Sequence, residues 1–527
     1  MKKIFFNFIN FIIIRNFLYR AYLRIPKKID FEGTPNFNPL TTKKKKLDSL
    51  LQIEDNYFTS KKNISLKMHS FDWLTDFKNS GGLHLLKKSR NLILDWCDYE
   101  YKLNSNVWND ILVSRRINNL LINFDFYGSS ANGEFQKKIK NLIYFHYKHL
   151  LFLNKFHKEK YDNDLEISKS LLLASKFFGT DENYQSVINL IKKQTNQQIN
   201  NYGFHKSINT IEQAKFIHQL IEIKNILLFY QYNKWPEINN IITDMTSLLK
   251  NLFHRDLSLA LFNATNNNRL DYVTNISNLQ KDIKIKKLNN VNNGITVIEV
   301  DKTKLFFDIT KPNSKLLNKK IHSGTLSFEM SSDKEKIITN CGSSDKYLSK
   351  NQVFFRYSAA HSTIIINNTN IAELSEKKGY KRIPENIKCT SEELKDYFVI
   401  SGSHDGYKKN FGVLTKRTLK ISKNGKKIIG TDQMVNLKRN FKNNNYEIRF
   451  HLMPECTCNL TNNDQQVLIK TKGGLAWYFK SRNNKIKIDK SIYIGNASHP
   501  LSTNQIILLG SIDSNKKIIN WELNKIN

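Results

Sequence analysis

The chain is poor in cysteine, proline, glycine and acidic residues. Its 527 residues include 5 Cys, 8 Pro and 20 Gly. So little proline and glycine excludes collagen-like chains and Pro/Gly-rich linkers. The cysteines are odd in number and lack the spacing of a metal finger, so we expect buried free thiols. Cysteine usage leaves the cellular compartment open.

Acidic residues are outnumbered, with 47 Asp+Glu against 82 Lys+Arg and a formal net charge of +35. The lysines are spread along the whole chain, a bias that A+T-rich coding can produce without any function. A positive field still concentrates any polyanion near the protein. We expect an anionic polysaccharide as partner and no nucleic acid, because no clustered aromatic platform for single strands is visible.

Long hydrophobic runs are also missing. An apolar run over residues 4–14 follows Lys2 and Lys3 and resembles the start of a signal peptide, but no small-residue cleavage site comes after it. The run is too short to span a bilayer. Asn7 and Asn10 give it a polar stripe, which predicts an amphipathic helix that docks on the protein or contacts a membrane peripherally.

What the chain does contain is 40% apolar residues, enough for large cores. From about residue 71 to 252 the apolar positions recur at three-to-four spacing, which predicts consecutive helices. The predicted helices cover residues 108–121, 137–156, 164–178, 184–196 and 211–229. Successive helices without strands are typical of a bundle, solenoid or toroid.

After residue 263 the pattern changes to short β-rich runs separated by turn signals. The predicted strands cover residues 295–300, 304–309, 325–330, 336–339, 363–367, 397–402, 413–421, 427–432, 446–453, 466–470, 475–479, 491–494 and 505–510. These runs predict an antiparallel β-sandwich. We therefore expect a multidomain chain, α then β, with an N-terminal basic segment and amphipathic helix over 1–60, a helical domain over 61–275 and the sandwich over 285–527.

Several short motifs occur in one order along about 450 residues. They are Phe71-Asp-Trp-Leu74, Arg115-Arg116, Leu259-Ala-Leu-Phe-Asn263, His322-Ser-Gly-Thr-Leu-Ser-Phe-Glu329, Asn340-Cys-Gly342, Ala359-Ala-His-Ser-Thr363, His404-Asp-Gly-Tyr407 and Arg449-Phe-His-Leu452. Together they resemble the heparinase II/III-like polysaccharide lyases, in particular an alphaproteobacterial-type branch.

The resemblance implies an (α/α) toroid followed by a β-sandwich, with a carbohydrate cleft between them. It implies a lyase that cleaves a uronic-acid polysaccharide by β-elimination, and a location in the cell envelope or periplasm. The cytoplasm stays open because no clear signal peptide is present. The chemistry requires no cofactor, and the sequence does not define the oligomeric state.

In the helical half, the segment from Tyr202 to Asn209 resembles a loop of the branch in which His205, Ser207 and Asn209 match. The resemblance implies that Asn209 binds a carboxylate and that His205 acts as base or acid. Tyr202 is a candidate acid or base on its chemistry alone. The alternative is that Ser207 or Asn209 caps the next helix.

In the β half, the family's His-x-His motif appears as Lys320 and His322. We assign Lys320 to substrate charge binding and His322 and His361 to catalysis. In some relatives the positions of His322, Asn340 and His361 bind a structural metal. Asn340 replaces a carboxylate, which disfavours zinc. The alternative is that both histidines are hydrogen-bonded residues of the sandwich.

Two more residues are candidates for substrate binding. Arg255 lies in a segment that resembles a turn of the branch near the domain junction, and a solvated arginine is the alternative. His404 is followed by Asp405, which could orient its imidazole. A turn held by Asp405 and Gly406 is the alternative. His451 lies inside a strand, where we expect a satisfied core histidine.

Three functions compete at this point. The first is the lyase. The second is a glycan-binding or envelope-associated structural protein that keeps the fold and has lost the chemistry, which the replacements at Lys320 and Asn340 favour. The third, an anionic-glycan hydrolase, lacks a convincing acidic pair at suitable spacing.

Overall fold

The computed structural model describes residues 19, 21, 53–60, 64–99, 106–156, 165–178, 181–200, 203–232, 235–285, 294–312, 321–344, 350–375, 379–437, 443–462, 464–482, 484–496 and 499–526. The chain forms two compact units. The first contains residues 1–198 and 218–239, and the second contains residues 199–217 and 240–527. The predicted helix within residues 1–14 lies outside the described residues.

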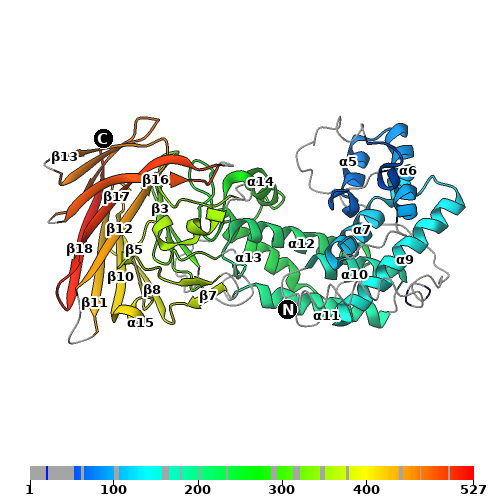
Figure 1. The fold of residues 1–527 in the computed structure, drawn as a ribbon, viewed down its shortest axis with the longest axis horizontal. Helices are drawn as coiled ribbons and strands as arrows, with labels where there is room; N and C mark the ends of the chain where they lie inside the picture. The colour runs from blue at the N-terminus through cyan, green and yellow to red at the C-terminus, as the bar shows by residue number, and fades with distance from the viewer. Residues whose placement is uncertain are drawn as a thin grey trace. The chain divides into compact units, whose positions relative to one another are not determined.

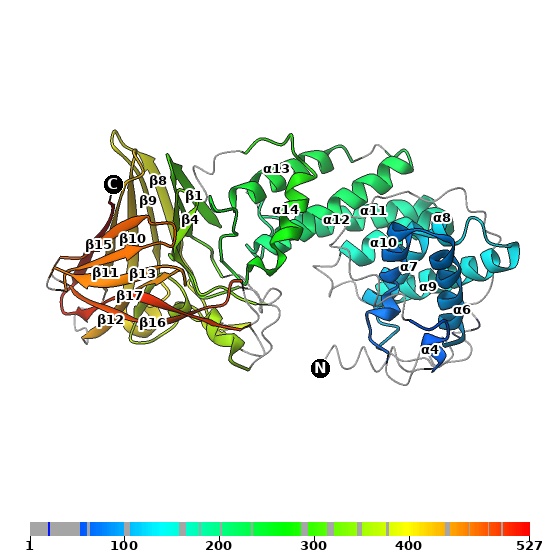
Figure 2. The same ribbon diagram turned by 90° about the horizontal axis from the view of Figure 1, so that it is seen from above.

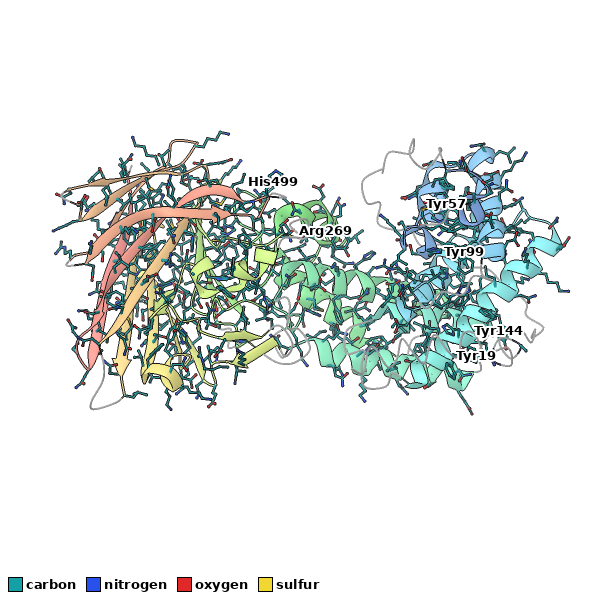
Figure 3. The ribbon with its side chains drawn as sticks, in the orientation of Figure 1. Tyr19, Tyr57, Tyr99, Tyr144, Arg269 and His499 are labelled. Atoms are coloured by element: carbon teal, nitrogen blue, oxygen red, sulfur yellow. The ribbon has the colours of Figure 1, made fainter. Side chains whose placement is uncertain are left out.

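The first unit is helical (Figure 1). Its helices are α4 (Tyr57–Ser60), η1 (Met68–Ser70), α5 (Trp73–Ser80), α6 (Leu83–Tyr99), α7 (Asp110–Ile122), α8 (Phe124–Tyr127), α9 (Gly133–Phe156), α10 (Leu165–Phe178) and α11 (Asp181–Gln198). α7 begins where the Asn109 side chain accepts a hydrogen bond from the Leu112 amide at 3.0 Å. Tyr19, labelled in Figure 3, bonds to His149 of α9 at 2.9 Å.

Arg116 of α7 lies at the centre of this unit and is fully buried. Its guanidinium stacks on the rings of Trp96 and Trp108, 4.8 and 5.3 Å from their centroids. It also donates to His146 Nε2 at 3.0 Å and to the carbonyls of His69 and Val107. A buried cation is stable only with such partners, so Arg116 serves the core of the first unit, whereas its neighbour Arg115 is exposed.

Two helices bridge the division of the chain. α12 (Thr210–Phe229) begins in the second unit and ends in the first, and α13 (Glu237–Asn251) lies mostly in the second. The second unit continues with η2 (Asn267–Arg269) and α14 (Leu270–Asn278) before the strands begin.

The rest of the second unit consists of antiparallel sheets (Figure 2). One eight-stranded sheet has the order β1-β2-β3-β4-β12-β17-β16, with β5 paired to β12, and the other has the order β13-β14-β15-β18-β11-β10-β9-β8. The strands are β1 (Ile295–Val300), β2 (Thr303–Asp308), β3 (Phe328–Ser332), β4 (Glu335–Thr339), β5 (Ile364–Ile366), β8 (Ile387–Glu393), β9 (Tyr397–His404), β10 (Val413–Ser422), β11 (Lys427–Asn436), β12 (Asn444–Leu452), β13 (Thr457–Thr461), β14 (Gln466–Lys470), β15 (Ala476–Lys480), β16 (Lys485–Tyr493), β17 (Leu501–Ile512) and β18 (Lys516–Lys525). A small hairpin joins β6 (Glu373–Ser375) and β7 (Gly379–Arg382), and short helical turns η3 (Lys350–Arg356), η4 (Ser358–Ala360) and α15 (Lys408–Phe411) connect the strands.

The two large sheets share one apolar core. Residues alternate between buried and partly exposed along β10 and β11, as one-sided burial of a strand requires. Trp521 of β18 stacks on Phe328 of β3 at 5.6 Å and meets Phe450 of β12 at 4.8 Å, so rings from both sheets interdigitate. This packing defines a β-sandwich.

The predicted order, helices followed by antiparallel strands, is confirmed. Each predicted strand overlaps an observed one, whereas β6, β7, β8, β13 and β18 were not predicted. The toroidal arrangement and the domain limits stay predictions. Among the described residues, no helix combines the length and apolarity needed to cross a bilayer.

Candidate active site

His205 lies in the segment that leads into α12, within the second unit. Its ring packs on Phe216 at 5.5 Å between centroids. Nδ1 accepts from the Ser207 amide at 3.3 Å and lies 2.7 Å from the Ser207 hydroxyl, while the His205 amide donates to Gln213 Oε1. A backbone N–H on Nδ1 leaves the proton of the neutral ring on Nε2. His205 is thus buried and fixed in one tautomer.

Asn209 caps α12. Its Oδ1 accepts from the Glu212 amide at 2.9 Å, which is the bond of an N-cap residue. Its Nδ2 donates to the Asn263 carbonyl at 2.5 Å. The capping alternative is therefore confirmed, and carboxylate binding by Asn209 stays a prediction without a contact that supports it.

Asn263 connects the α12 entrance to the sandwich. Its Nδ2 donates to the Ile208 carbonyl at 3.3 Å, and its Oδ1 accepts from the His322 amide at 3.1 Å. Its backbone has φ +49°, a left-handed conformation that asparagine tolerates better than most residues. One buried side chain thus ties the segment of His205 and Asn209 to the segment of His322.

His322 and His361 form a hydrogen-bonded pair. His361 Nδ1 donates to the Tyr357 carbonyl at 2.8 Å, since a carbonyl only accepts. His361 Nε2 therefore carries the lone pair of the neutral ring and accepts from His322 Nδ1 at 3.2 Å. This pattern assigns an unprotonated Nε2 to His322. That nitrogen makes no hydrogen bond to any other described residue.

Burial keeps both rings neutral. His322 is 5% exposed and His361 is 2% exposed. Desolvation, followed by the effects of His361 and Arg356, holds the pKa of His322 well below its usual 6.5. Desolvation also lowers the pKa of His361 to about 4. At neutral pH the pair is a fixed dipole whose free lone pair is His322 Nε2.

Hydroxyl groups hold the two histidine segments together. Ser358 Oγ donates to the Ser323 carbonyl at 2.7 Å, and Ser323 Oγ lies 3.0 Å from Ser358 Oγ and accepts from the Ala372 amide. A Cβ on Gly324 would come within 2.6 Å of His361 Cδ2, so glycine is required there for the rings to meet. The pair is therefore positioned by packing and by these hydrogen bonds.

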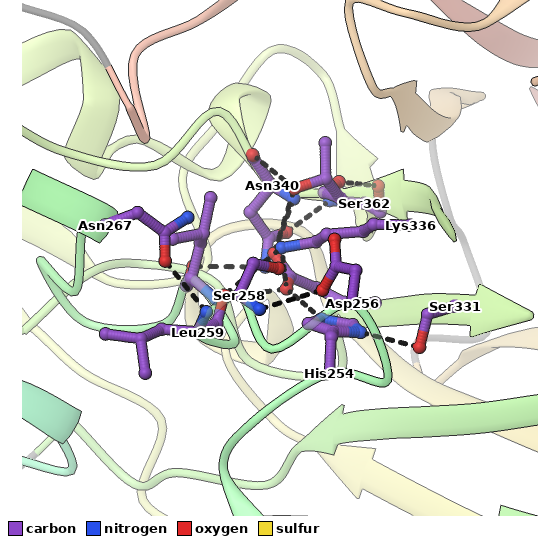
Figure 4. A network of polar contacts seen from close by, with 12 residues as sticks. His254, Asp256, Ser258, Leu259, Asn267, Ser331, Lys336, Asn340 and Ser362 are labelled. Carbon is purple, nitrogen blue, oxygen red and sulfur yellow. Dashed lines mark hydrogen bonds and ion pairs between the residues drawn. The ribbon is translucent and has the colours of Figure 1, made fainter. Parts of the chain in front are cut away.

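A buried ionic network supports the same region (Figure 4). Glu329 binds Lys336 Nζ at 2.6 Å and His254 Nε2 at 2.9 Å, and its carboxylate also accepts from the amides of Leu261 and Asn340. Burial opposes ionisation, but the Lys336 ammonium and the His254 bond hold the pKa of Glu329 at about 2. The network anchors the segment containing His254 to β3 and β4.

The residues of the family's metal position do not fit a structural zinc. Asn340 Oδ1 accepts from the Ser362 amide at 3.0 Å, and Asn340 Nδ2 faces the Leu261 carbonyl at 3.4 Å. The facing nitrogens of His322 and His361 bond to each other. Structural zinc needs four ligands, and the described residues contain no cluster of three or more His, Cys, Asp or Glu that could hold a metal.

The remaining candidates make internal contacts. Arg255 binds Glu299 at 2.8 Å and the carbonyls of Asp301 and Asp333, as expected for the alternative of a junction arginine. His404 is buried, and its Nδ1 accepts from the Gly406 amide at 3.1 Å. The Thr415 hydroxyl lies 3.1 and 3.0 Å from the two ring nitrogens.

Asp405 does not orient His404. Its carboxylate accepts from the amides of Glu385 and Asn386. Its carbonyl accepts from the Lys408 amide at 2.9 Å, which is the bond of a turn, so the turn alternative is confirmed. His451 bonds to Ser491 Oγ and the Ala359 carbonyl, which confirms a satisfied core histidine. Substrate binding by Arg255 and His404 stays a prediction that these contacts do not support.

Two predicted site residues, Tyr202 and Lys320, lie outside the described residues. The structure adds residues that the sequence did not single out individually: Asn263, Tyr357 and Arg417. Arg417 donates to the carbonyls of Leu326 and Ser362 at 3.0 and 2.8 Å, directly beside both histidine segments. The available sequence signals were the asparagine that ends the motif over residues 259–263 and a basic residue inside an alternating strand.

Comparison with known proteins agrees with this fold. The chain aligns with a mutant of heparan sulfate lyase HepC from Pedobacter heparinus at 14% identity, covering 97% of this chain and 88% of that one, with a TM-score of 0.71. A heparinase III structure gives 12% identity, coverage of 96% and 89%, and a TM-score of 0.70. No curated protein sequence matches. The sequence profile described as heparinase II/III-like, C-terminal, matches residues 288–522, and this part of the chain belongs to the heparinase II/III-like family.

Proposed function

We propose that the chain is a polysaccharide lyase that cleaves a uronic-acid-containing polysaccharide by β-elimination. The likeness to heparan sulfate lyases supports the fold for such a function. The observation that carries the proposal is the single free lone pair of His322 Nε2, fixed by the chain His322–His361–Tyr357. It provides a neutral base of defined direction in the sandwich.

The reaction requires three contributions. A base removes the C5 proton of the uronate, the electron pair forms the C4=C5 bond, the C4–O bond breaks, and an acid protonates the departing oxygen. A group that binds the carboxylate stabilises the negative charge that develops next to C5. A histidine whose pKa lies well below 6.5 is unprotonated at neutral pH, so we assign His322 to the base.

The other roles follow from chemistry and motif. His205 carries its proton on Nε2, which suits a hydrogen bond to the leaving oxygen, and Tyr202 is the candidate acid that protonates this oxygen. Lys320 is assigned to the uronate carboxylate, because an ammonium binds a carboxylate but is a poor base near neutral pH. If the substrate is an envelope polysaccharide, we expect an envelope or periplasmic location. Residues 1–14 would then provide peripheral contact with the membrane.

A glycan panel tests the proposal. The purified chain is incubated with uronate-containing polysaccharides and with a neutral polysaccharide, and ultraviolet absorbance of a 4,5-unsaturated uronate is followed. His322→Ala is expected to lower the rate at least about tenfold, since general acid–base help is worth roughly 10²–10⁴-fold. His84→Ala, a change at an exposed histidine of the first unit, serves as the matched control. Equal rates for the two variants would exclude His322 as the base.

A glycan-binding protein without turnover is the second candidate. It is favoured by the deep burial of both histidines and by the internal hydrogen bonds of Asn340. Such a protein would bind uronate polymers in the same panel and yield no absorbing product with any of them.

A further inference from the structure

A groove lies on the outer face of the sheet with the order β13-β14-β15-β18-β11-β10-β9-β8. None of the catalytic candidates lines it. It has a volume of about 480 Å³, within the roughly 300–1,000 Å³ typical of ligand pockets. Lys480, Arg482 and Lys517 supply cations to it, and Glu522 is the acidic residue of its lining. All of these residues belong to the second unit.

The groove exists because β15 leaves the sheet early. β15 pairs with β18 from Trp477 to Lys480, and the chain then turns away toward β16. The half of β18 that begins at Lys516 therefore has β11 on one side and lacks β15 on the other. Because β15 and β18 diverge, the surface between them is a groove and not flat.

The wall of the groove is held in place. Ser481 Oγ donates to the Asn520 carbonyl at 2.9 Å, and Asn484 Nδ2 donates to Ser481 Oγ at 2.9 Å. Tyr446 of the opposite sheet also donates to Asn484 Oδ1 at 3.4 Å. The segment that presents Arg482 is thus anchored at both ends, which limits the ordering cost of binding.

The charge of the groove is positive after internal pairing. Glu522 is bound by Lys427 at 2.9 Å, and the pKa of its carboxyl lies below the usual value despite partial burial. Lys517 faces Asp513 at 3.1 Å. Lys480 lies opposite Glu522 in the β15–β18 register, where its charge also lowers the pKa of that carboxyl, and Arg482 forms no salt bridge with a described residue. The lining therefore carries more cations than carboxylates, and this excess of positive charge matches an anionic ligand.

Neutral polar groups flank these cations. The register aligns Thr390, Ser401, Thr418, Thr431 and Asn520 in one row across five strands. Within it, Thr431 Oγ1 donates to Asn520 Oδ1 at 3.0 Å, so the Asn520 amide is oriented. Hydroxyl and amide groups in a row suit sugar hydroxyls. The exposed Ile518 offers an apolar surface for a sugar ring.

Nucleic acid fits this groove less well. Single strands need aromatic rings on which bases stack. The aromatic residue of the lining, Trp521, is 2% exposed and packs on Phe328 and Phe450 inside the sandwich. A groove of cations, hydroxyls and amides without an accessible ring favours a glycan.

We propose that this groove is a second, non-catalytic binding site for an anionic polysaccharide, which contacts carboxylate or sulfate groups through Lys480 and Arg482. Such a site would keep a polymer attached between cleavage events and would raise its local concentration. The proposal goes beyond the proposed function and does not depend on turnover.

Calorimetric titration tests it. The full chain carrying His322→Ala is titrated with an oligogalacturonate and with the same oligomer after reduction of its carboxyl groups. Lys480→Ala/Arg482→Ala is expected to weaken binding of the charged oligomer about tenfold or more, because bonds between charged groups are the strong ones. The reduced oligomer should bind weakly to both chains.

The control removes the same charge elsewhere. Lys137→Ala/Lys193→Ala deletes two exposed lysines of the first unit and should leave the affinity unchanged. Equal losses in the two double variants would show a general effect of net charge and overturn the proposal. It would also be overturned if the charged oligomer did not bind, or if a single-stranded oligonucleotide bound the groove more tightly. Circular dichroism verifies that each variant is folded.

Discussion

At the residue scale, a single backbone carbonyl sets the protonation of two rings. Tyr357 accepts from His361, which obliges His361 to accept from His322 and leaves the lone pair of His322 Nε2 without a donor among the described residues. The tautomers of both rings are thus fixed without a carboxylate. The sequence motif identified His361 as a candidate, but only the structure shows that the Tyr357 carbonyl is its partner.

The pH dependence of turnover follows from this arrangement. The base must be unprotonated, so kcat/KM should fall as pH decreases through the pKa of His322, and that pKa lies well below 6.5. We therefore expect activity to persist from neutral pH into the mildly acidic range. Rates measured across this range, with circular dichroism at each pH as the control for folding, check this. An acid limb centred near pH 7 would contradict the assignment.

Asn263 is expected to be a positioning residue. Asn263→Ala removes the bonds to Ile208 and His322 and should cost about 1–3 kcal/mol of unfolding free energy, with at least a tenfold loss of kcat. Asn263→Asp keeps the acceptor for the His322 amide and should retain more kcat. Asn263→Gly separates backbone conformation from bonding, since it accepts φ +49° and lacks both bonds. Full activity in Asn263→Gly would refute the role.

At the element scale, β10 and β11 join the core to the segments that carry His322 and His361. Arg417 of β10 binds Asp432 of β11 through two bonds of 2.7 and 3.0 Å, and Asp432 also accepts from Trp521 Nε1. The remaining guanidinium nitrogen reaches the carbonyls of Leu326 and Ser362. The sandwich interior thus fixes the backbone on either side of the histidine pair.

Removing Arg417 alone should lower the free energy of unfolding more than removing the charges of both Arg417 and Asp432. Arg417→Met leaves a buried carboxylate and is expected to cost about 3–5 kcal/mol. Arg417→Met/Asp432→Asn keeps an acceptor for Trp521 and should recover part of that loss. Urea unfolding followed by tryptophan fluorescence measures both, with Arg482→Met as the exposed control. A double variant no more stable than the single one would contradict this account.

The sequence predicted the elements better than their connections. Runs such as residues 413–421 and 427–432 alternate so clearly that one-sided strands were evident. β18 was missed although Asn520, Glu522 and Asn524 alternate with its core residues Ile519, Trp521 and Leu523, which is the pattern of a one-sided strand. β8 was missed because it has few buried side chains. The joining role of Asn263 depends on contacts 54 and 59 residues away, which no local pattern contains.

At the scale of the whole molecule, buried neutral histidines make stability depend on pH. Desolvation lowers the pKa of His69, His149, His254 and His361 to about 4, and that of His404 and His451 to about 3. The unfolded chain binds these protons near pH 6.5 and the folded chain does not. Stability is therefore lost as pH falls from about 6.5 towards 4.

Each such histidine contributes up to about 1.4 kcal/mol per pH unit within this window. We expect the urea midpoint to fall steeply between pH 7 and pH 5. Glu329, whose pKa is about 2 against 4.5 in the unfolded chain, adds a further loss below about pH 4.5. A midpoint that stays constant from pH 7 to pH 5 would show that these histidines are protonated in the fold.

The central claim concerns the bond that is broken, and the mass of the products tests it most directly. A uronate oligosaccharide is incubated with the chain, and the fragments are weighed by mass spectrometry. β-elimination predicts fragments whose masses sum to that of the substrate, with an unsaturated uronate on one of them, formed by the wild-type chain and much more slowly by His322→Ala. Fragments that together have gained one water would identify a hydrolase, and an intact oligosaccharide that stays bound would identify a binding protein; either result contradicts the account.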